Sequence, residues 1–356
     1  MQSPEIRGVH LRLKDTESTE ALIRYIKEGL APLGVNLMVL EFNPGYNFTC
    51  YPELANGTFG KEDSKKIAAV AKECGIRIVP LFMCLGHQGW RYEKNSLLTH
   101  YPEFDETPDV VEGVKEPDKV AGKIITNTPD GIFYCHSWCA SNDGVYEYVF
   151  PMMDEIMEDL GADCLHVGMD ETFSIAEDSC PRCVGKGRAE LFAHTINTLY
   201  NHIVKEKGWQ MMMWSDRLNN ATEHGYHAWE GDILGMWRAA DMIPKDIILA
   251  DWHYDMNEKG FQSGFESLME KGFTVLPAGW RDMKQTEFLW SEAQKSANSA
   301  QKKGYSGKIA GLLVTCWSEA NAENLNELNT HVKAKLQSRE IDLQGVASSI
   351  VYMSGL

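Results

Sequence analysis

The sequence has no apolar run of the roughly 18 to 20 residues that a helix needs to cross a bilayer. It is also short of positive charge, because 34 lysines and arginines stand against 51 aspartates and glutamates, a formal net charge of −17. Nucleic acid and anionic membrane surfaces repel such a chain. These features predict no membrane span and no nucleic-acid partner, and they fit a neutral or cationic ligand.

The chain also lacks a disulfide-style framework and a secretory signal. Its nine cysteines are scattered. The first residues, MQSPEIRG, lead at once into an apolar segment. Both features favour a cytoplasmic location, and the alternative is an exported or periplasmic protein whose signal peptide has been removed. The sequence leaves open whether the chain forms a homodimer.

What the sequence does contain is one alternation, repeated to its end. Short apolar segments are separated by stretches with helical periodicity. The apolar segments begin at Ile6, Val35, Ile76, Asp163, Trp209, Asp246, Phe273 and Ile309. Eight strands alternating with helices predict a single catalytic (β/α)8 barrel over residues 1–356.

Two observations refine this prediction. A doubly wound open sheet is the alternative fold, but no glycine-rich phosphate-binding loop follows the first strand. The longest irregular stretches, 86–142 and 219–245, follow the third and fifth strands. Barrel enzymes build their sites from the loops at this end of the strands.

Aromatic and ionisable residues gather at the predicted strand ends. Four successive strands finish with tryptophan, which packing explains poorly because branched aliphatics normally fill a barrel. Indole rings stack on the C–H faces of sugars and carboxylates bind sugar hydroxyls, so the pattern predicts a carbohydrate pocket. The candidate residues are Arg7, His87, His166, Asp170, Glu171, Trp214, Asp216, Trp252, Tyr254, Trp280, Trp317 and Glu319.

Two of these residues, Asp170 and Glu171, are adjacent in the segment LHVGMDETF. Side chains alternate along a strand, so both acids can face one pocket only if the chain turns there, which Gly168 permits. A like-charged neighbour raises the pKa of one carboxyl, which then acts as general acid while the other stays ionised. A helix N-cap or a solvated acid pair is the alternative.

The segment HVGMDE, residues 166–171, resembles the His-x-Gly-x-Asp-Glu signature of glycoside hydrolase family 20, the β-N-acetylhexosaminidases. The similarity extends over most of the chain, to Arg7-Gly8, Gly86-His87, Trp214 with Asp216, and Trp317-Ser318-Glu319. The opening segment VHLRLK at 9–14, and the absence of a preceding non-catalytic domain, make the chain most similar to the hexosaminidase D branch.

The resemblance implies exo-acting hydrolysis of terminal β-linked N-acetylglucosamine or N-acetylgalactosamine without a catalytic cofactor. In the substrate-assisted retaining mechanism, the 2-acetamido oxygen attacks the anomeric carbon and forms an oxazolinium intermediate. Glu171 would act as acid and then base, and Asp170 would hold the acetamido N–H. The resemblance also implies that Arg7 and Glu319 bind sugar hydroxyls, that Trp214, Trp252, Trp280 and Trp317 wall the pocket, that Tyr254 bonds the acetamido oxygen, and that His87 and His166 support the site.

The chain departs from the family pattern at two positions. Met169 stands where many members have glycine, and Arg12 stands where many have aspartate. These departures bear on sugar selectivity, and a sulfated amino sugar is an alternative substrate. A metal-dependent hydrolase would need a His-x-His on the first strand, which the chain lacks. A catalytically silent sugar-binding barrel would have little need for both acids.

Two cysteine pairs lie in loops at the same barrel face. Cys180 and Cys183 form a CxxC motif after the two acids, and Cys135 and Cys139 form a CxxxC motif in the preceding loop. Together they predict a structural zinc site that joins the loops. Free thiols, or a disulfide within the CxxC motif, are the alternatives.

Overall fold

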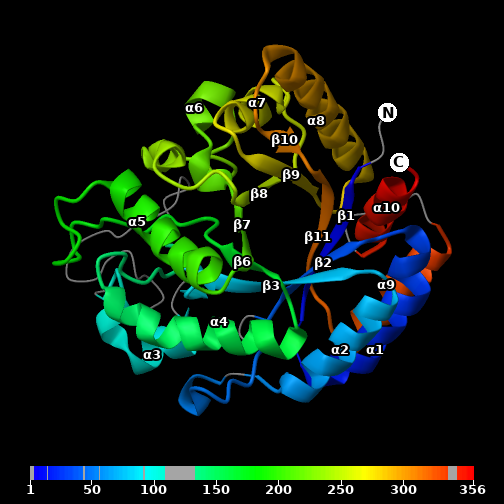
Figure 1. Ribbon diagram of the computed structural model, residues 1–356, viewed down its shortest axis with the longest axis horizontal. Helices are drawn as coiled ribbons and strands as arrows, with labels where there is room; N and C mark the ends of the chain where they lie inside the picture. The colour runs from blue at the N-terminus through cyan, green and yellow to red at the C-terminus, as the bar shows by residue number, and fades with distance from the viewer. Residues whose placement is uncertain are drawn as a thin grey trace.

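The computed structural model describes residues 4–13, 15–42, 45–55, 57–90, 93–108, 133–335 and 343–356. Its centre is a ring of eight parallel strands in the order β9-β11-β1-β2-β3-β6-β7-β8, closed by pairing of β8 with β9 (Figure 1). The strands are β1 (Ile6–Arg12), β2 (Leu37–Glu41), β3 (Arg77–Cys84), β6 (Cys164–Gly168), β7 (Gln210–Trp214), β8 (Ile248–Trp252), β9 (Thr274–Gly279) and β11 (Gly311–Glu319). This ring confirms the predicted (β/α)8 barrel and all eight predicted strands.

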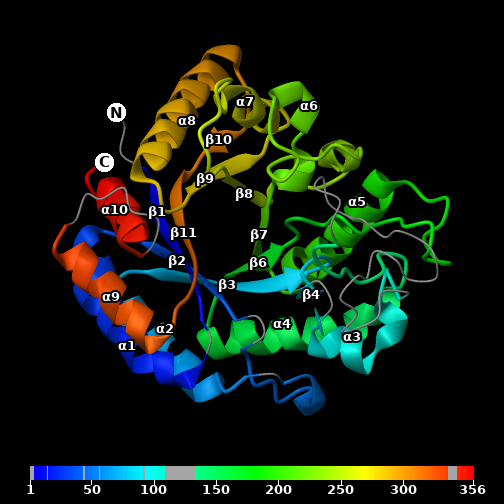
Figure 2. The same ribbon diagram turned by 180° about the vertical axis from the view of Figure 1, so that it is seen from behind.

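Helices surround the ring when it is seen from either end (Figure 1 and Figure 2). Those that cover it are α1 (Thr19–Tyr25), α2 (Lys61–Glu73), α4 (Tyr146–Leu160), α5 (Arg188–Tyr200), α7 (Gln262–Glu270), α8 (Met283–Lys303), α9 (Ala322–Lys333) and α10 (Leu343–Ser354). After β7 the connection is irregular and holds only the short α6 (Ala221–His224) and two 3-10 segments, Asp216–Leu218 and Met236–Asp241.

Two apolar layers hold the barrel together. Along β6, Leu165 and Val167 face the helices, while Cys164 belongs to the cluster inside the ring. The interior cluster combines small residues such as Ala250 and Ala278 with the large ring of Trp214. Alternation along each strand therefore produces both layers, as expected for strands buried on both faces.

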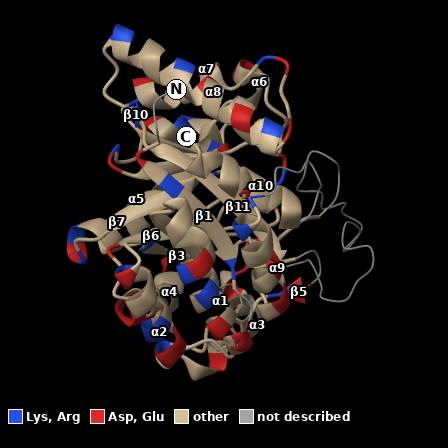
Figure 3. Ribbon diagram, turned by 90° about the vertical axis from the view of Figure 1, so that its right-hand side faces the viewer, with Lys and Arg blue, Asp and Glu red and all other residues tan. Residues whose placement is uncertain are grey.

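Charged residues of both signs are distributed over outer helices such as α1 and α2 (Figure 3). Within the described part of the chain, none of the helices combines the length and the apolar character that a membrane span requires.

The loops at the carboxyl ends of β3 and β6 carry most of the extra structure. The loop after β3 contains the hairpin of β4 (Gly89–Trp90) and β5 (Glu93–Lys94) and the short helix α3 (Ser96–His100). It packs beside the loop that follows β6, since Glu177 donates its backbone N–H to Glu106. These two loops form one side of the face that holds the site.

Candidate active site

A cavity of about 310 Å³ opens at the carboxyl ends of the barrel strands. Aromatic rings form most of its walls, and three carboxylates reach it. Its volume is typical of sites for small ligands. The lining residues are Arg12, Glu41, Met83, His87, Trp90, Tyr134, Asp170, Glu171, Trp252, Tyr254, Trp280 and Trp317.

A sharp turn at the end of β6 brings both adjacent acids into this cavity. Gly168, Met169 and Glu171 have φ values of 64°, 75° and 47°, in the left-handed region. A Cβ on Gly168 would lie 2.6 Å from the sulfur of Met83, so a larger residue would force the Met83 side chain to move. Left-handed residues other than glycine cost on the order of 1–3 kcal/mol each and persist only where surrounding contacts enforce them. The turn predicted from the sequence is therefore present and strained.

His87 links the two acids. Its Nε2 lies 3.3 Å from Oδ2 of Asp170 and 3.4 Å from Oε2 of Glu171. Burial acts to lower the pKa of His87, but the two carboxylates outweigh it and raise the pKa well above its usual range. A protonated His87 partly neutralises the pair and holds both carboxylates on one side of the cavity.

Asp170 retains one oxygen for a ligand. Its Oδ1 is buried and has no hydrogen-bond partner among the described residues. A buried acceptor left unpaired costs about 1–3 kcal/mol. A ligand N–H at this position would recover that free energy.

Tyr254 offers a donor within the same cavity. Trp317 donates its Nε1–H to the Tyr254 hydroxyl at 2.9 Å, and Thr315 Oγ1 lies 3.2 Å away. Burial raises the pKa of Tyr254, so the phenol keeps its proton at neutral pH. Because the oxygen accepts from Trp317, the O–H of Tyr254 can be directed to a ligand.

Asp216 lies behind the cavity rather than in its lining. Its buried Oδ2 accepts the backbone N–H of Glu171 at 2.9 Å and Nε of Arg217 at 2.8 Å. Burial raises the pKa of Asp216 to about 7, against the opposing effect of Arg217. The sequence analysis placed Asp216 in contact with substrate. In the structure it instead positions Glu171.

Trp214 and His166 also lie beneath the cavity. Both are fully buried, with ring centroids 4.6 Å apart. His166 Nδ1 accepts the backbone N–H of Gly168 at 3.0 Å, and burial lowers the pKa of His166, so the ring is neutral. Trp214 lies 5.9 Å from the Trp317 ring that lines the cavity. These two residues support the floor of the cavity and the turn after β6.

The structure corrects the placement of Arg7. This residue is at the amino end of β1, paired with Leu312, and its Nε donates to the Gly34 carbonyl at 2.8 Å. The prediction that Arg7 binds sugar hydroxyls is therefore wrong, because the cavity is at the other end of the strand. Arg12 lines the cavity instead.

Arg12 belongs to a row of polar groups on β1 and β2. Its Nε is 3.6 Å from Oε1 of Glu41, whose Oε2 lies 3.1 Å from Nε2 of His10. Glu319, also predicted to bind sugar, lies exposed at the end of β11 beside Arg12. It stands at the rim, outside the lining of the cavity.

Sequence reasoning missed four other lining residues. Glu41 ends the apolar run of β2 and carries the same signal, a charge at a strand end, that identified the other candidates. Met83 lies inside the apolar run of β3 and carries no such signal. Trp90 and Tyr134 come from the long loop after β3, where no periodicity places them. Their rings are 4.9 Å apart and cover one side of the cavity.

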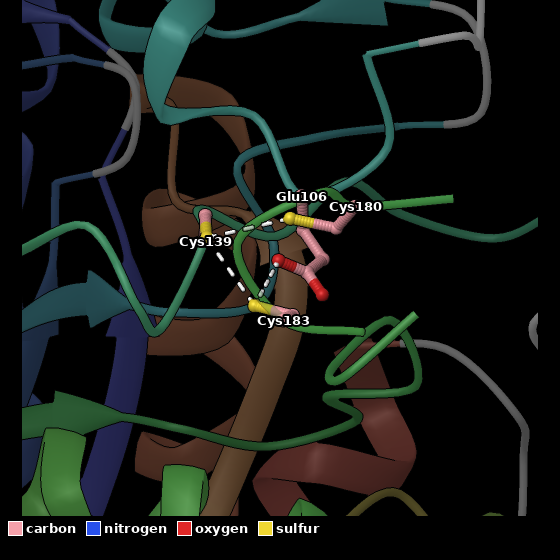
Figure 4. A group of neighbouring side chains, drawn as sticks. All are labelled: Glu106, Cys139, Cys180 and Cys183. Atoms are coloured by element: carbon pink, nitrogen blue, oxygen red, sulfur yellow. Dashed lines mark hydrogen bonds between the residues drawn. The ribbon is translucent and has the colours of Figure 1, made fainter. Parts of the chain in front are cut away.

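The cysteine prediction is corrected at one position. Cys139, Cys180 and Cys183 converge, but the fourth potential ligand beside them is Glu106 (Figure 4). Cys135 instead lies with its Sγ 3.7 Å from the Glu171 carbonyl oxygen. A four-cysteine site with Cys135 as a ligand is therefore excluded by the arrangement of the loops.

A parallel barrel with paired acids between aromatic walls at its carboxyl end is the arrangement expected of a glycoside hydrolase. Residues 41–332 match the model of glycosyl hydrolase family 20, catalytic domain. The chain belongs to this family, which confirms the resemblance found in the sequence. No curated protein sequence matches the chain.

Solved structures of this family share the fold. The chitobiase of Flavobacterium johnsoniae is 19% identical with a TM-score of 0.61, over 98% of this chain and 51% of that one. The β-N-acetylhexosaminidase of Bacteroides fragilis is 14% identical with a TM-score of 0.59, over 97% and 66%. That of Streptomyces coelicolor is 16% identical with a TM-score of 0.58, over 97% and 64%. The chain thus spans about half to two thirds of the length of these proteins.

Proposed function

We propose that the chain is an exo-acting β-N-acetylhexosaminidase that removes terminal β-linked N-acetylglucosamine or N-acetylgalactosamine by substrate-assisted retention. The observation that carries this proposal is the convergence of Asp170, Glu171 and Tyr254 on one cavity. Asp170 Oδ1 is an unpaired buried acceptor and Tyr254 is a neutral donor. Together they match the N–H and the carbonyl oxygen of an acetamido group.

The position of the acids favours a nucleophile supplied by the sugar. Retaining enzymes with a carboxylate nucleophile place one acid on each side of the scissile bond. Here both carboxylates approach the same nitrogen of His87, so they lie on one side. The acetamido oxygen would therefore attack the anomeric carbon, forming the C–O bond of an oxazolinium ring as the glycosidic bond breaks.

The two acids have different roles in this reaction. Glu171 gives its proton to the leaving oxygen, so the aglycone departs as an alcohol. Asp170 accepts the acetamido N–H and stabilises the positive charge that develops on the ring. Glu171 then takes a proton from the water that attacks the anomeric carbon from the side of the departed aglycone. The oxazolinium ring opens, and the product keeps the β configuration.

The cavity suits the end of a glycan chain. Rings of Trp252, Trp280 and Trp317 form its walls, and Glu41 and Arg12 offer hydroxyl partners at the β1–β2 side. A second cavity of about 790 Å³ shares Trp252, Tyr254 and Trp280 with the first. The first cavity would take the terminal sugar, and the second would take the aglycone. All nine cysteines lie among the described residues and none forms a disulfide, which fits the cytoplasmic location that we propose.

Aryl 2-acetamido-2-deoxy-β-glucoside and β-galactoside, assayed side by side, test the reaction and the sugar preference. We expect release of the aryl group, loss of release in Glu171→Gln, and inhibition by a thiazoline that resembles the oxazolinium ring. Glu158→Gln, an exposed change on α4, is the matched control. Fluorination of the acetamido methyl group weakens its oxygen as a nucleophile, so the rate should fall with each fluorine.

Three outcomes would count against the proposal. A rate that does not respond to fluorination would exclude the acetamido oxygen as nucleophile. Binding of the thiazoline without release of either aryl group would point to a substituted substrate such as a sulfated amino sugar. Neither binding nor release would leave a barrel without hexosaminidase activity.

A further inference from the structure

Four potential metal ligands converge beside the catalytic loops, on residues that the proposed reaction does not use (Figure 4). Their ligand atoms all lie within 4.8 Å of one another, and all four residues are buried. Sγ of Cys139 is 3.3 Å from that of Cys183 and 3.6 Å from that of Cys180. Oε2 of Glu106 is 3.1 Å from Sγ of Cys183.

These separations are close to the edges of a zinc coordination tetrahedron. With Zn–S bonds of about 2.3 Å, sulfur atoms around tetrahedral zinc are about 3.8 Å apart, and a carboxylate oxygen is slightly nearer. Small outward shifts of the four side chains would therefore admit the ion. Three thiolates and a carboxylate are acceptable zinc ligands in a closed structural site.

Neighbouring groups hold the side chains of the cluster in orientations suited to binding a metal ion. Glu106 Oε1 accepts the backbone N–H of Glu177 at 2.9 Å, which fixes the carboxylate while Oε2 faces the sulfurs. Nε of Arg182 lies 3.3 Å from Sγ of Cys139. Metal ligands are commonly oriented by such outer contacts. We propose that Glu106, Cys139, Cys180 and Cys183 bind one structural zinc ion.

The ion would join two loops that shape the active site. Glu106 and Cys139 come from the loop after β3, and the other two ligands come from the loop after the catalytic acids. Tyr134, five residues before Cys139, lines the cavity. The ion would therefore hold the Tyr134 wall against the segment that carries Glu171, without touching the substrate.

Metal content of the purified full chain, expressed with zinc and kept reduced, tests this site. We expect one zinc per chain, lost in Cys139→Ala and Cys180→Ala and bound more weakly in Glu106→Gln. Cys164→Ala is the matched control, because Cys164 lies inside the barrel away from the cluster. Replacement of zinc by Co²⁺ should produce a sulfur-to-metal charge-transfer band in the wild type and not in Cys139→Ala.

A second control separates this site from the catalytic group. His87, Asp170 and Glu171 also lie close enough together to hold an ion. Zinc that is lost in His87→Gln but kept in Cys139→Ala would overturn the proposal. So would a wild-type chain without zinc whose mass is two hydrogens lower, since that mass identifies a disulfide.

The wild type alone provides a test if the cysteine variants fail to fold. We expect a chelator to remove zinc, to lower the Tm, and to make three further thiols reactive. Re-addition of zinc should restore the Tm and protect the three thiols again. A Tm and a thiol count that do not respond to the chelator would refute the site.

Discussion

Removal of the Tyr254 hydroxyl tests most directly how the site recognises an acetamido group. In Tyr254→Phe the ring remains, so its contacts with Trp252 and Trp280, at centroid distances of 5.0 and 5.2 Å, are kept. The change removes the donor that would hold the acetamido oxygen. Loss of one positioning contact costs about 100-fold in rate, or about 2.7 kcal/mol. We therefore expect kcat to fall by about 100-fold with a small change in KM.

The same change has a separate effect on stability. Trp317 Nε1 donates to the Tyr254 hydroxyl and loses this acceptor in the variant. A buried donor left unpaired costs about 1–3 kcal/mol, and because Trp317 is only half-buried at the cavity wall, we expect the low end of this range, about 1 kcal/mol in the free energy of unfolding. Urea unfolding measures this loss independently of kcat, which separates the two roles of the hydroxyl.

Steady-state kinetics on the preferred aryl glycoside provide the assay, and Tyr25→Phe is the matched control. Tyr25 is fully buried on α1, and its hydroxyl has no hydrogen-bond partner among the described residues. We expect the control to keep its kcat. A Tyr254→Phe variant with a kcat within about threefold of the wild type, but with reduced stability, would refute our reasoning, because the hydroxyl would then serve Trp317 alone.

Three further predictions follow from buried groups around the site. In Asp216→Asn, the amide oxygen is a weaker acceptor for the Glu171 backbone N–H and for Arg217, so we expect kcat to fall; unchanged kcat would show that Asp216 does not position the acid. Burial opposes the shift, yet two adjacent carboxylates raise the pKa of His253 to about 9. This stabilisation is complete below about pH 6.5 and is lost as pH rises through 9, so the urea midpoint should fall over that range in the wild type and less in His253→Gln. Gly168→Ala should lower both kcat and the urea midpoint, because its φ is 64° and its Cβ would meet Met83; wild-type values would mean that the turn tolerates a side chain.

The strands could be predicted from the sequence because each is buried on both faces. Parallel strands in a barrel read as continuous apolar runs. All five residues of β6 and of β2 are buried, for example. The connection after β7 could not be predicted in the same way. Its 3-10 segments and α6 are only three to six residues long, too short to leave a periodic pattern in the sequence.

The site was predictable where position along a strand determined it. Trp252 and Trp317 stand at the ends of apolar runs, and both line the cavity. Arg7 was chosen by its motif, although it is the second residue of β1 and Arg12 is the last. The rule that barrel sites lie at carboxyl ends favours Arg12.

Contacts between loops could not be predicted from the sequence. Glu106 meets the CxxC motif only because the loop after β3 folds back onto the loop after β6. The sequence spacing predicted Cys135 as a zinc ligand as readily as Cys139, since a CxxxC motif can present both sulfurs to one ion. Its Sγ turns instead toward the Glu171 carbonyl.

The strain in the β6 turn has a physical explanation in the barrel itself. If β6 continued as a regular strand, one of the adjacent acids would face the apolar layer between strands and helices. Burying an unpaired carboxylate there costs more than the roughly 2–6 kcal/mol of the two left-handed residues Met169 and Glu171. The turn avoids this cost by placing both acids in the cavity, and Met169 occupies the apolar layer in their place, fully buried. The adjacency of Asp170 and Glu171 is thus compatible with the fold only because the backbone leaves the strand at Gly168.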